Sequence, residues 1–490
     1  MQNREISIDV LRGLAIVGMV LSGTISRNPD LPAWLYHAQI APPDFSFNPE
    51  LPGLTWVDLV FPFFLFAMGM AFPFALNKSV KEGATMRNIA AKIINRSIKL
   101  LFFAVLLGHL SPFHYPAEMG WLRYFMGFLA FAGFFMAFSK FPHFKNHESK
   151  INIAGYIFLA SLLIARTQVF DAEFSPHSHD IIILVLANMA FFGGLTWYFT
   201  RNNWYVRLGI MALYFAIRLT QGVEGSINQM LWDFTPLSWL AGVFPAMYET
   251  LAEYGLDLKR TLFYNPDFLK YLMIVIPGSI AGDLIYKGIQ NKSSCQDHSH
   301  WTQKWIIPAI LFANLAFNLW GLQSRSLNLV WLINLVTIGF LAYQMKLKKN
   351  NKAFRIINQL LGWSIFWLLL GLVFEAWEGG IKKDHATLSY FFLTSGLSGF
   401  MIVFFKMVGP VFQPGRSLGF LALTGMNPLL GYVAASYFIM PVLYFAQLLP
   451  WMDQWHESWH WAGLLRGVIL TGIMIWLTVF SVRKKYYWKT

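Results

Sequence analysis

His37 and Asp58 are the residues of this chain whose types and surroundings best suit chemistry. His37 precedes a long apolar run, and Asp58 stands near the start of that run. Ionisable side chains beside lipid are energetically costly, so such a pair is by default functional rather than structural. An imidazole can accept a proton near neutral pH, and a neighbouring carboxylate can fix its tautomer. The pair predicts a general base, His37, with Asp58 as its orienting group; a histidine satisfied by the backbone of a proline-rich loop is the structural alternative.

A second ionisable pair lies in the first apolar run, where residues 7–13 read SIDVLRG. Asp9 and Arg12 are three positions apart, which places both side chains on one face of a helix. Paired there, they either line a cavity, with Asp9 as a substrate contact, or hold two helices together. The sequence leaves both interpretations open.

Several further segments accompany these two pairs along the chain. They are Tyr36-His37-Ala38, Gly53-Leu54-Thr55 followed by Asp58-Leu59-Val60-Phe61-Pro62 and Gly69, Asn265-Pro266-Asp267 with Pro277 and Gly282, Ile381 to Gly396 (IKKDHATLSYFFLTSG), and Gly425-Met426-Asn427. In content and order these segments resemble the heparan-alpha-glucosaminide N-acetyltransferase-like family of membrane acyltransferases. The run from His37 to Gly69 is the most specific part of the resemblance.

The resemblance implies an enzyme that transfers an acetyl group from cytoplasmic acetyl-CoA to a sugar or glycan acceptor across the membrane. The acceptor group is an amine or a hydroxyl, and the implied assembly is a homodimer. Acyl transfer from a thioester requires a base for the acceptor's proton and stabilisation of the tetrahedral oxyanion. His37 fits the first role, in direct transfer or through an acetyl-histidine intermediate. Lys382 and Lys383 lie near the predicted outer face, where they can contact the acceptor.

Basic residues on the predicted inner side suit the phosphates of CoA, because Lys and Arg recognise phosphate groups well. We expect these contacts from Arg12, Arg87, Arg96 and Lys99. Asn427 is expected to hydrogen-bond either the pantetheine of CoA or another helix. A basic inner loop also arises from membrane topology alone, so topology is the alternative explanation for these cations.

The composition is that of a protein embedded in a membrane. Hydrophobic residues make up 56% and charged residues 13% of the 490 residues, whereas a soluble domain has roughly 25% charged residues. Fourteen apolar runs reach the length that spans a bilayer, roughly 17–25 residues. The runs near Ile151 and Tyr205 are the weakest. The sequence therefore predicts an all-α, polytopic transmembrane bundle of about 12–14 spans.

The formal net charge is +13, from 38 Lys and Arg against 25 Asp and Glu. If the N-terminus is inside, most of the basic residues fall on inner segments, as the positive-inside rule requires. The positive charge is then a topology signal, both termini are cytoplasmic, and no nucleic acid is expected as a partner. We expect a multi-pass protein of the bacterial cytoplasmic (inner) membrane, in contact with membrane lipid.

The chain shows no linker long enough to divide it, so residues 1–490 are predicted to form a single membrane domain. Three of the predicted outer loops are long, near residues 26–53, 220–266 and 375–387. Ordered loops of this size usually shape a binding site.

Two other functions are compatible with parts of the sequence. A multi-pass transporter or channel would keep the fold without acyl-transfer chemistry, but it needs a midplane site between broken helices. His456-Glu457-Ser458-Trp459-His460 matches the H-E-x-x-H pattern of zinc hydrolases, with Asp453 as the neighbouring acid for a third ligand. These residues lie in a tryptophan-rich outer hairpin, so an interfacial belt without metal is the expectation.

Overall fold

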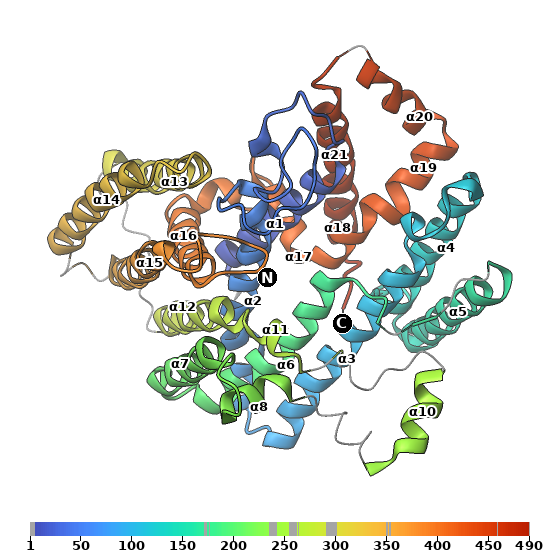
Figure 1. Ribbon diagram of the computed structural model, residues 1–490, viewed down its shortest axis with the longest axis horizontal. Helices are drawn as coiled ribbons and strands as arrows, with labels where there is room; N and C mark the ends of the chain where they lie inside the picture. The colour runs from blue at the N-terminus through green and yellow to red at the C-terminus, as the bar shows by residue number, and fades with distance from the viewer. Residues whose placement is uncertain are drawn as a thin grey trace. The chain divides into compact units, whose positions relative to one another are not determined.

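The computed structural model describes residues 5–170, 174–175, 177–234, 243–253, 262, 264–290, 301–348, 351, 354–457 and 459–489. Regular structure in this part of the chain is helical, as predicted (Figure 1). Twelve of the described helices are long and apolar enough to cross a membrane, within the predicted range. The run near Ile151 is one of them, as Lys145–Gln168, whereas the helix at Trp204–Thr220 is not. The chain is a multi-pass membrane protein with an all-α fold.

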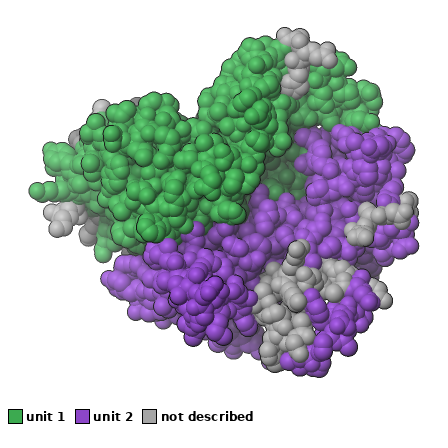
Figure 2. Space-filling model, in the orientation of Figure 1, with its two compact units in different colours: residues 1–74, 277–435, 443–487 green, residues 75–276, 436–442, 488–490 purple. Residues whose placement is uncertain are grey.

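Two compact units make up the fold (Figure 2). The first comprises residues 1–74, 277–435 and 443–487, and the second comprises residues 75–276, 436–442 and 488–490. Each unit is assembled from segments that are distant in the sequence. Because the chain passes several times between the two units, no single linker in the sequence marks the division. The sequence therefore suggested a single domain.

The first unit contains most of the spanning helices. The described helices of this unit, short ones included, are α1 (Ile6–Thr24), most of α2 (Trp56–Lys81), most of α12 (Leu272–Gln290), α13 (Trp301–Gln323), α14 (Leu327–Leu347), α15 (Arg355–Val373), α16 (Leu388–Met407), α17 (Gly419–Met426), α18 (Pro428–Ala434), α20 (Leu448–Asp453) and α21 (Ala462–Arg483). A 3-10 turn at Ala33–Leu35 lies in the loop between α1 and α2, and another at Phe374–Ala376 follows α15.

The second unit is built from the middle of the sequence. Its helices are α3 (Met86–Leu110), α4 (Trp121–Phe138), α5 (Glu148–Val169), α6 (Ile181–Thr200), α7 (Trp204–Thr220), α8 (Ile227–Asp233), α10 (Pro245–Glu253) and α11 (Pro266–Leu269). The short helix α19 (Met440–Phe445) contributes residues to both units.

Helix α1 packs closely on α17 because two glycines face the opposite backbones. A Cβ atom at Gly13 would overlap the carbonyl oxygen of Leu421, and one at Gly425 would overlap that of Asp9. Small residues allow this approach in lipid, where helices associate by close packing rather than by hydrophobic burial. The SIDVLRG and GMN segments of the sequence therefore meet in the interior of the first unit.

Helices α13 and α14 form a hairpin joined by buried asparagines, and they lie side by side in Figure 1. Asn314 donates to Oδ1 of Asn334 (3.0 Å) and to the hydroxyl of Thr337 (3.3 Å). Asn334 donates in turn to Oδ1 of Asn318 (2.9 Å). Interhelical amide hydrogen bonds of this kind stabilise helix pairs in membranes.

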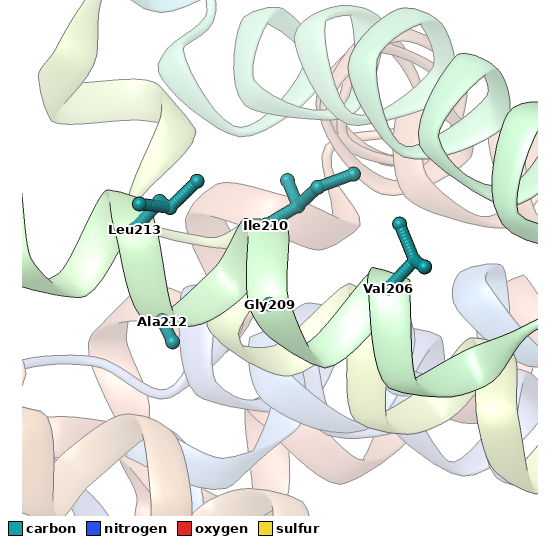
Figure 3. Close-up of a pocket in the computed structure, with 5 residues that line it drawn as sticks. All are labelled: Val206, Gly209, Ile210, Ala212 and Leu213. Carbon is teal, nitrogen blue, oxygen red and sulfur yellow. The ribbon is translucent and has the colours of Figure 1, made fainter.

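Helix α7 carries an open, apolar groove of about 500 Å³ on its surface. Figure 3 shows Val206, Ile210 and Leu213 bordering the groove above Gly209. The described residues that line the groove have no titratable or nucleophilic side chain, and they include none of the residues on which the sequence-based prediction of chemistry rests.

Candidate active site around His37

Asp58 is the centre of the site. It lies in the first turn of α2, and 2% of its surface is exposed. Its Oδ1 atom lies 2.7 Å from Nδ1 of His37. Its Oδ2 atom accepts hydrogen bonds from the backbone N–H groups of Ala38 (3.2 Å) and Thr55 (3.0 Å) and from the Thr55 hydroxyl (3.1 Å). The N-terminal end of a helix also favours negative charge. The carboxylate is therefore fixed, and it fixes the imidazole that it contacts.

His37 is held in one tautomer by this contact. An ionised carboxylate only accepts hydrogen bonds, so the 2.7 Å contact places a hydrogen on Nδ1 of His37. Nε2 then carries the lone pair of the neutral ring. The His37 side chain is 33% exposed, against 2% for Asp58, so the ring is open to a substrate while its partner is not. The spacing in the sequence could not show that these side chains meet.

Lys383 lies against the ring of His37. Its Nζ atom is 3.3 Å from Nδ1 and 3.4 Å from Nε2 of that ring. Lys382 points elsewhere, because its Nζ pairs with Oε2 of Glu50 at 3.0 Å and the Lys382 side chain is only 9% exposed. Of the two adjacent lysines that the sequence suggested as acceptor contacts, the structure brings Lys383 to the base.

Gln39 holds the backbone beside Lys383 in place. Its side-chain Oε1 accepts a 2.9 Å hydrogen bond from the backbone N–H of Asp384, and its Nε2 donates to the carbonyl oxygen of the same residue. The same Nε2 donates to Pro49 at 3.0 Å. Gln39 is buried, and sequence reasoning missed it; its position two residues after His37 was the available signal.

A backbone hydrogen bond and an ion pair hold the loops that carry the site residues. The N–H of Gly53 donates to the carbonyl oxygen of Ile381 at 2.8 Å, which joins the first and third long loops. Arg325 pairs with the buried Glu375 at 2.6 Å. Gly380 faces this pair with φ +96°, and a Cβ atom there would lie 3.0 Å from Oε1 of Glu375, so the position requires glycine. Arg325 and Glu375 were not identified from the sequence.

Asp9 and Arg12 form a separate pair in the first unit. Their side chains are 3.7 Å apart, and Arg12 also donates to the carbonyl oxygen of Ala67 on α2 at 3.4 Å. Ala67 follows Asp58 by nine residues, which is about 14 Å along a helix. The pair therefore ties α1 to α2, and the structure does not place Asp9 beside His37.

The residues predicted to hold CoA are distributed over both units. Asn427 is buried in the first unit and donates to Oγ of Ser481 (3.3 Å) and to the carbonyl oxygen of Tyr486 (3.0 Å). Three predicted cations lie on α3 in the second unit: Arg87 and Arg96 are exposed and Lys99 is half-buried. The hydrogen bonds of Asn427 favour the helix-bonding alternative that the sequence allowed.

The described residues of the H-E-x-x-H segment are not part of an α-helix. A 3-10 turn covers Gln454–Glu457, and Ser458 lies outside the described residues. Asp453, the neighbouring acid, pairs with Nε of Arg466 at 2.9 Å. Within the described ranges, no three His, Cys, Asp or Glu side chains gather as a metal site would need. The two-histidine arrangement of zinc hydrolases uses one continuous α-helical face, whereas the described backbone up to Glu457 is a 3-10 turn.

Comparison with protein families gives a match over the N-terminal part of the chain. No match was found among curated proteins. The model of a family described as "Domain of unknown function (DUF5009)" matches residues 4–251. This range is slightly more than half of the 490 residues and contains His37, Gln39 and Asp58, while Lys383 lies beyond it. The chain therefore belongs to the DUF5009 family.

Proposed function

We propose that this protein is a transmembrane acyltransferase that moves an acetyl group from acetyl-CoA to an amine or hydroxyl group of a sugar or glycan. The observation that carries the proposal is the 2.7 Å contact between Nδ1 of His37 and Oδ1 of Asp58. It supports a neutral imidazole whose Nε2 can take the acceptor's proton. The resemblance of the surrounding segments to membrane acyltransferases supports the reaction type.

Each residue of the site has a role in this proposal. His37 removes the proton of the attacking amine or hydroxyl group and later returns it to the departing thiolate. Asp58 keeps the ring in the correct tautomer and stabilises the imidazolium that forms between these steps. The backbone and hydroxyl donors of Thr55 keep the carboxylate ionised and in place.

The proposal also includes a binding site for acetyl-CoA and a location in the membrane. Arg87 and Arg96 are exposed residues of α3, and guanidinium groups suit the phosphates of CoA. Arg12 and Asn427 have protein partners, so they support the donor site less directly. We place the protein in the bacterial cytoplasmic membrane as a homodimer, with the donor supplied from inside and the acceptor outside.

Binding and transfer by the protein purified in detergent test this function. The donor is radiolabelled acetyl-CoA, and the acceptors are a mixed pool of hexosamines and oligosaccharides. Wild type is expected to bind acetyl-CoA and label an acceptor. His37→Ala is expected to bind with the same Kd within about twofold and to lose transfer by about 10²–10⁴-fold, the usual contribution of a general base.

The matched control is His147→Ala, which removes an exposed histidine at the start of α5 and should leave transfer unchanged. If wild type does not bind acetyl-CoA, the acyltransferase proposal is wrong, and substrate transport is the next activity to measure. Equal loss of transfer in His37→Ala and His147→Ala would also contradict the role given to His37.

A further inference from the structure

We infer that Lys383 stabilises the oxyanion of the acyl-transfer step and that Gln39 positions it, an inference that rests on the proposed function. The sequence suggested Lys383 only as an acceptor contact, together with Lys382. In the structure these neighbouring lysines have different partners. Lys382 pairs with Glu50, whereas Lys383 lies against His37, the proposed general base.

The geometry at His37 places the Lys383 ammonium over the ring face. Its Nζ atom is 3.3 Å from Nδ1 and 3.4 Å from Nε2. A point in the ring plane at equal distance from both nitrogens would collide with the ring carbons, so Nζ lies out of that plane. The Nε2 lone pair points in the plane, and it therefore stays open to an acceptor proton.

The charge of Lys383 has one distant ion-pair partner, Asp384, and it also interacts electrostatically with the buried Asp58 carboxylate beside His37. Its Nζ lies 4.0 Å from Oδ2 of Asp384, whose side chain is 51% exposed. Lys382 and Arg325, by contrast, lie 3.0 Å and 2.6 Å from their carboxylate partners. The Lys383 side chain is 23% exposed, so a substrate can reach its ammonium group. A charge-assisted hydrogen bond to an anion is stronger than one between neutral groups.

A hydrogen-bond donor or a cation at this place would stabilise the charge that develops in the acyl-transfer step. The acceptor nitrogen or oxygen bonds to the thioester carbon, its proton passes to Nε2 of His37, and an electron pair moves to the carbonyl oxygen. The oxyanion then reforms the carbonyl, the carbon–sulfur bond breaks, and the thiolate takes the proton from His37. Because attack occurs within hydrogen-bond reach of Nε2, an ammonium group 3.4 Å from Nε2 lies close to the oxygen that gains charge.

Gln39 explains how a long, flexible lysine keeps this position. Both atoms of the Gln39 amide bind the backbone of Asp384, the residue that follows Lys383. Gln39 itself lies two residues after His37, so one amide fixes the base and the cation relative to each other. Lys383 is the catalytic residue of this inference, and Gln39 is a positioning residue.

The test compares the binding of acetyl-CoA with that of S-carboxymethyl-CoA, which carries a carboxylate one carbon beyond the position of the thioester carbonyl and so brings a negative charge next to the oxyanion position. Both Kd values are measured for the full-length protein in detergent. Wild type is expected to prefer the anionic analogue, and Lys383→Met to lose that preference by about tenfold to a hundredfold, the value of a hydrogen bond to a charged group. The Kd for acetyl-CoA should stay within about twofold.

Turnover and two further variants complete the test. Lys383→Met should lower kcat more than KM changes, and Lys383→Arg should recover part of kcat. Gln39→Ala should weaken the preference for the anionic analogue less than Lys383→Met does. The control is Lys270→Met, which removes a lysine that pairs with Asp267 outside the site and should retain the preference.

The possible failures are distinguishable. If wild type binds and turns over acetyl-CoA while Lys383→Met keeps both kcat and the preference, the inference is wrong and the proposed function stands. If Lys383→Met changes only the KM of the acceptor, Lys383 is an acceptor contact and not the oxyanion group. If wild type binds neither CoA compound, the proposed function fails and the inference fails with it.

Discussion

The hydroxyl group of Tyr390 donates a hydrogen bond of 2.9 Å to the backbone carbonyl oxygen of Asp58. In an α-helix this carbonyl would accept from the N–H four residues later. That residue is Pro62, which has no N–H group. Tyr390, buried on α16, supplies the missing donor and so joins α16 to the helix turn that carries Asp58. The D-L-V-F-P segment on α2 and the tyrosine on α16 are therefore two halves of one arrangement.

Replacing Tyr390 tests whether its hydroxyl group compensates for the N–H group that Pro62 lacks. Tyr390→Phe leaves the Asp58 carbonyl buried without its donor, so we expect the free energy of unfolding to fall by about 1–3 kcal/mol. In a Pro62→Ala background the backbone N–H returns, and the same Tyr390→Phe change should cost less than half as much. Unfolding in mixed micelles with increasing SDS measures all four proteins. Equal costs in the two backgrounds would show that Tyr390 does not compensate for Pro62.

Asp58→Asn separates orientation from binding. The asparagine amide has nearly the same shape as the carboxylate, but it can present N–H to Nδ1 of His37 and so select the wrong tautomer. We expect kcat to fall by about 10²–10⁴-fold, while the Kd for acetyl-CoA changes by less than about twofold. Asp44→Asn, an exposed change in the loop that precedes α2, is the control. A full kcat in Asp58→Asn would remove Asp58 from the mechanism.

The sequence predicted the parts of this protein that depend on local pattern. Apolar length and composition were enough for the helical, membrane-spanning fold, because a bilayer demands continuous helices. The types of His37 and Asp58 were enough to suggest a base and its partner, and their contact agrees with that suggestion.

Contacts between distant segments were not predictable in the same way. Gln39 and Asp384 are 345 positions apart, and Tyr390 and Asp58 are 332 positions apart. Neither glutamine nor tyrosine carries a distinctive pattern, since the role of each comes from the backbone group that it meets. The different partners of Lys382 and Lys383 likewise depend on the geometry of the loop. Two adjacent lysines look alike in the sequence, so the sequence could not show which of them would reach His37.

Gly13 is predicted to tolerate no side chain. A Cβ atom there would overlap the backbone carbonyl of Leu421, so Gly13→Ala must separate α1 from α17. We expect a loss of about 2 kcal/mol or more of unfolding free energy, as for overpacked cores. Gly23→Ala on the same helix has nothing within 4 Å of the new Cβ and should be neutral or stabilising. Similar stability of the two variants would contradict the close packing of α1 on α17.

The C-terminal Lys489 predicts a pH dependence of stability. Burial and the neighbouring Lys140 lower its pKa from 10.5 to about 8. Between these two values the unfolded chain binds more protons than the folded one, so stability should rise as the pH increases from about 8 toward 10.5. Lys489→Gln should remove this part of the rise and make the Tm less dependent on pH across that window. An identical Tm profile in the variant would show that Lys489 does not contribute.

The asparagine network between α13 and α14 predicts that a substitution lowers the free energy of unfolding most when it leaves a buried amide group without a hydrogen-bond partner. Asn334→Leu removes the acceptor of both Asn314 and Asn318, so the free energy of unfolding should fall by about 1–3 kcal/mol. Replacing Asn314, Asn318 and Asn334 together by leucine removes donors and acceptors at once and should cost less than the sum of the single changes. Asn328→Leu, an exposed change on the same helix, should stay within about 0.5 kcal/mol of wild type. Additive single costs in the triple variant would mean that the three amides act independently rather than as one network.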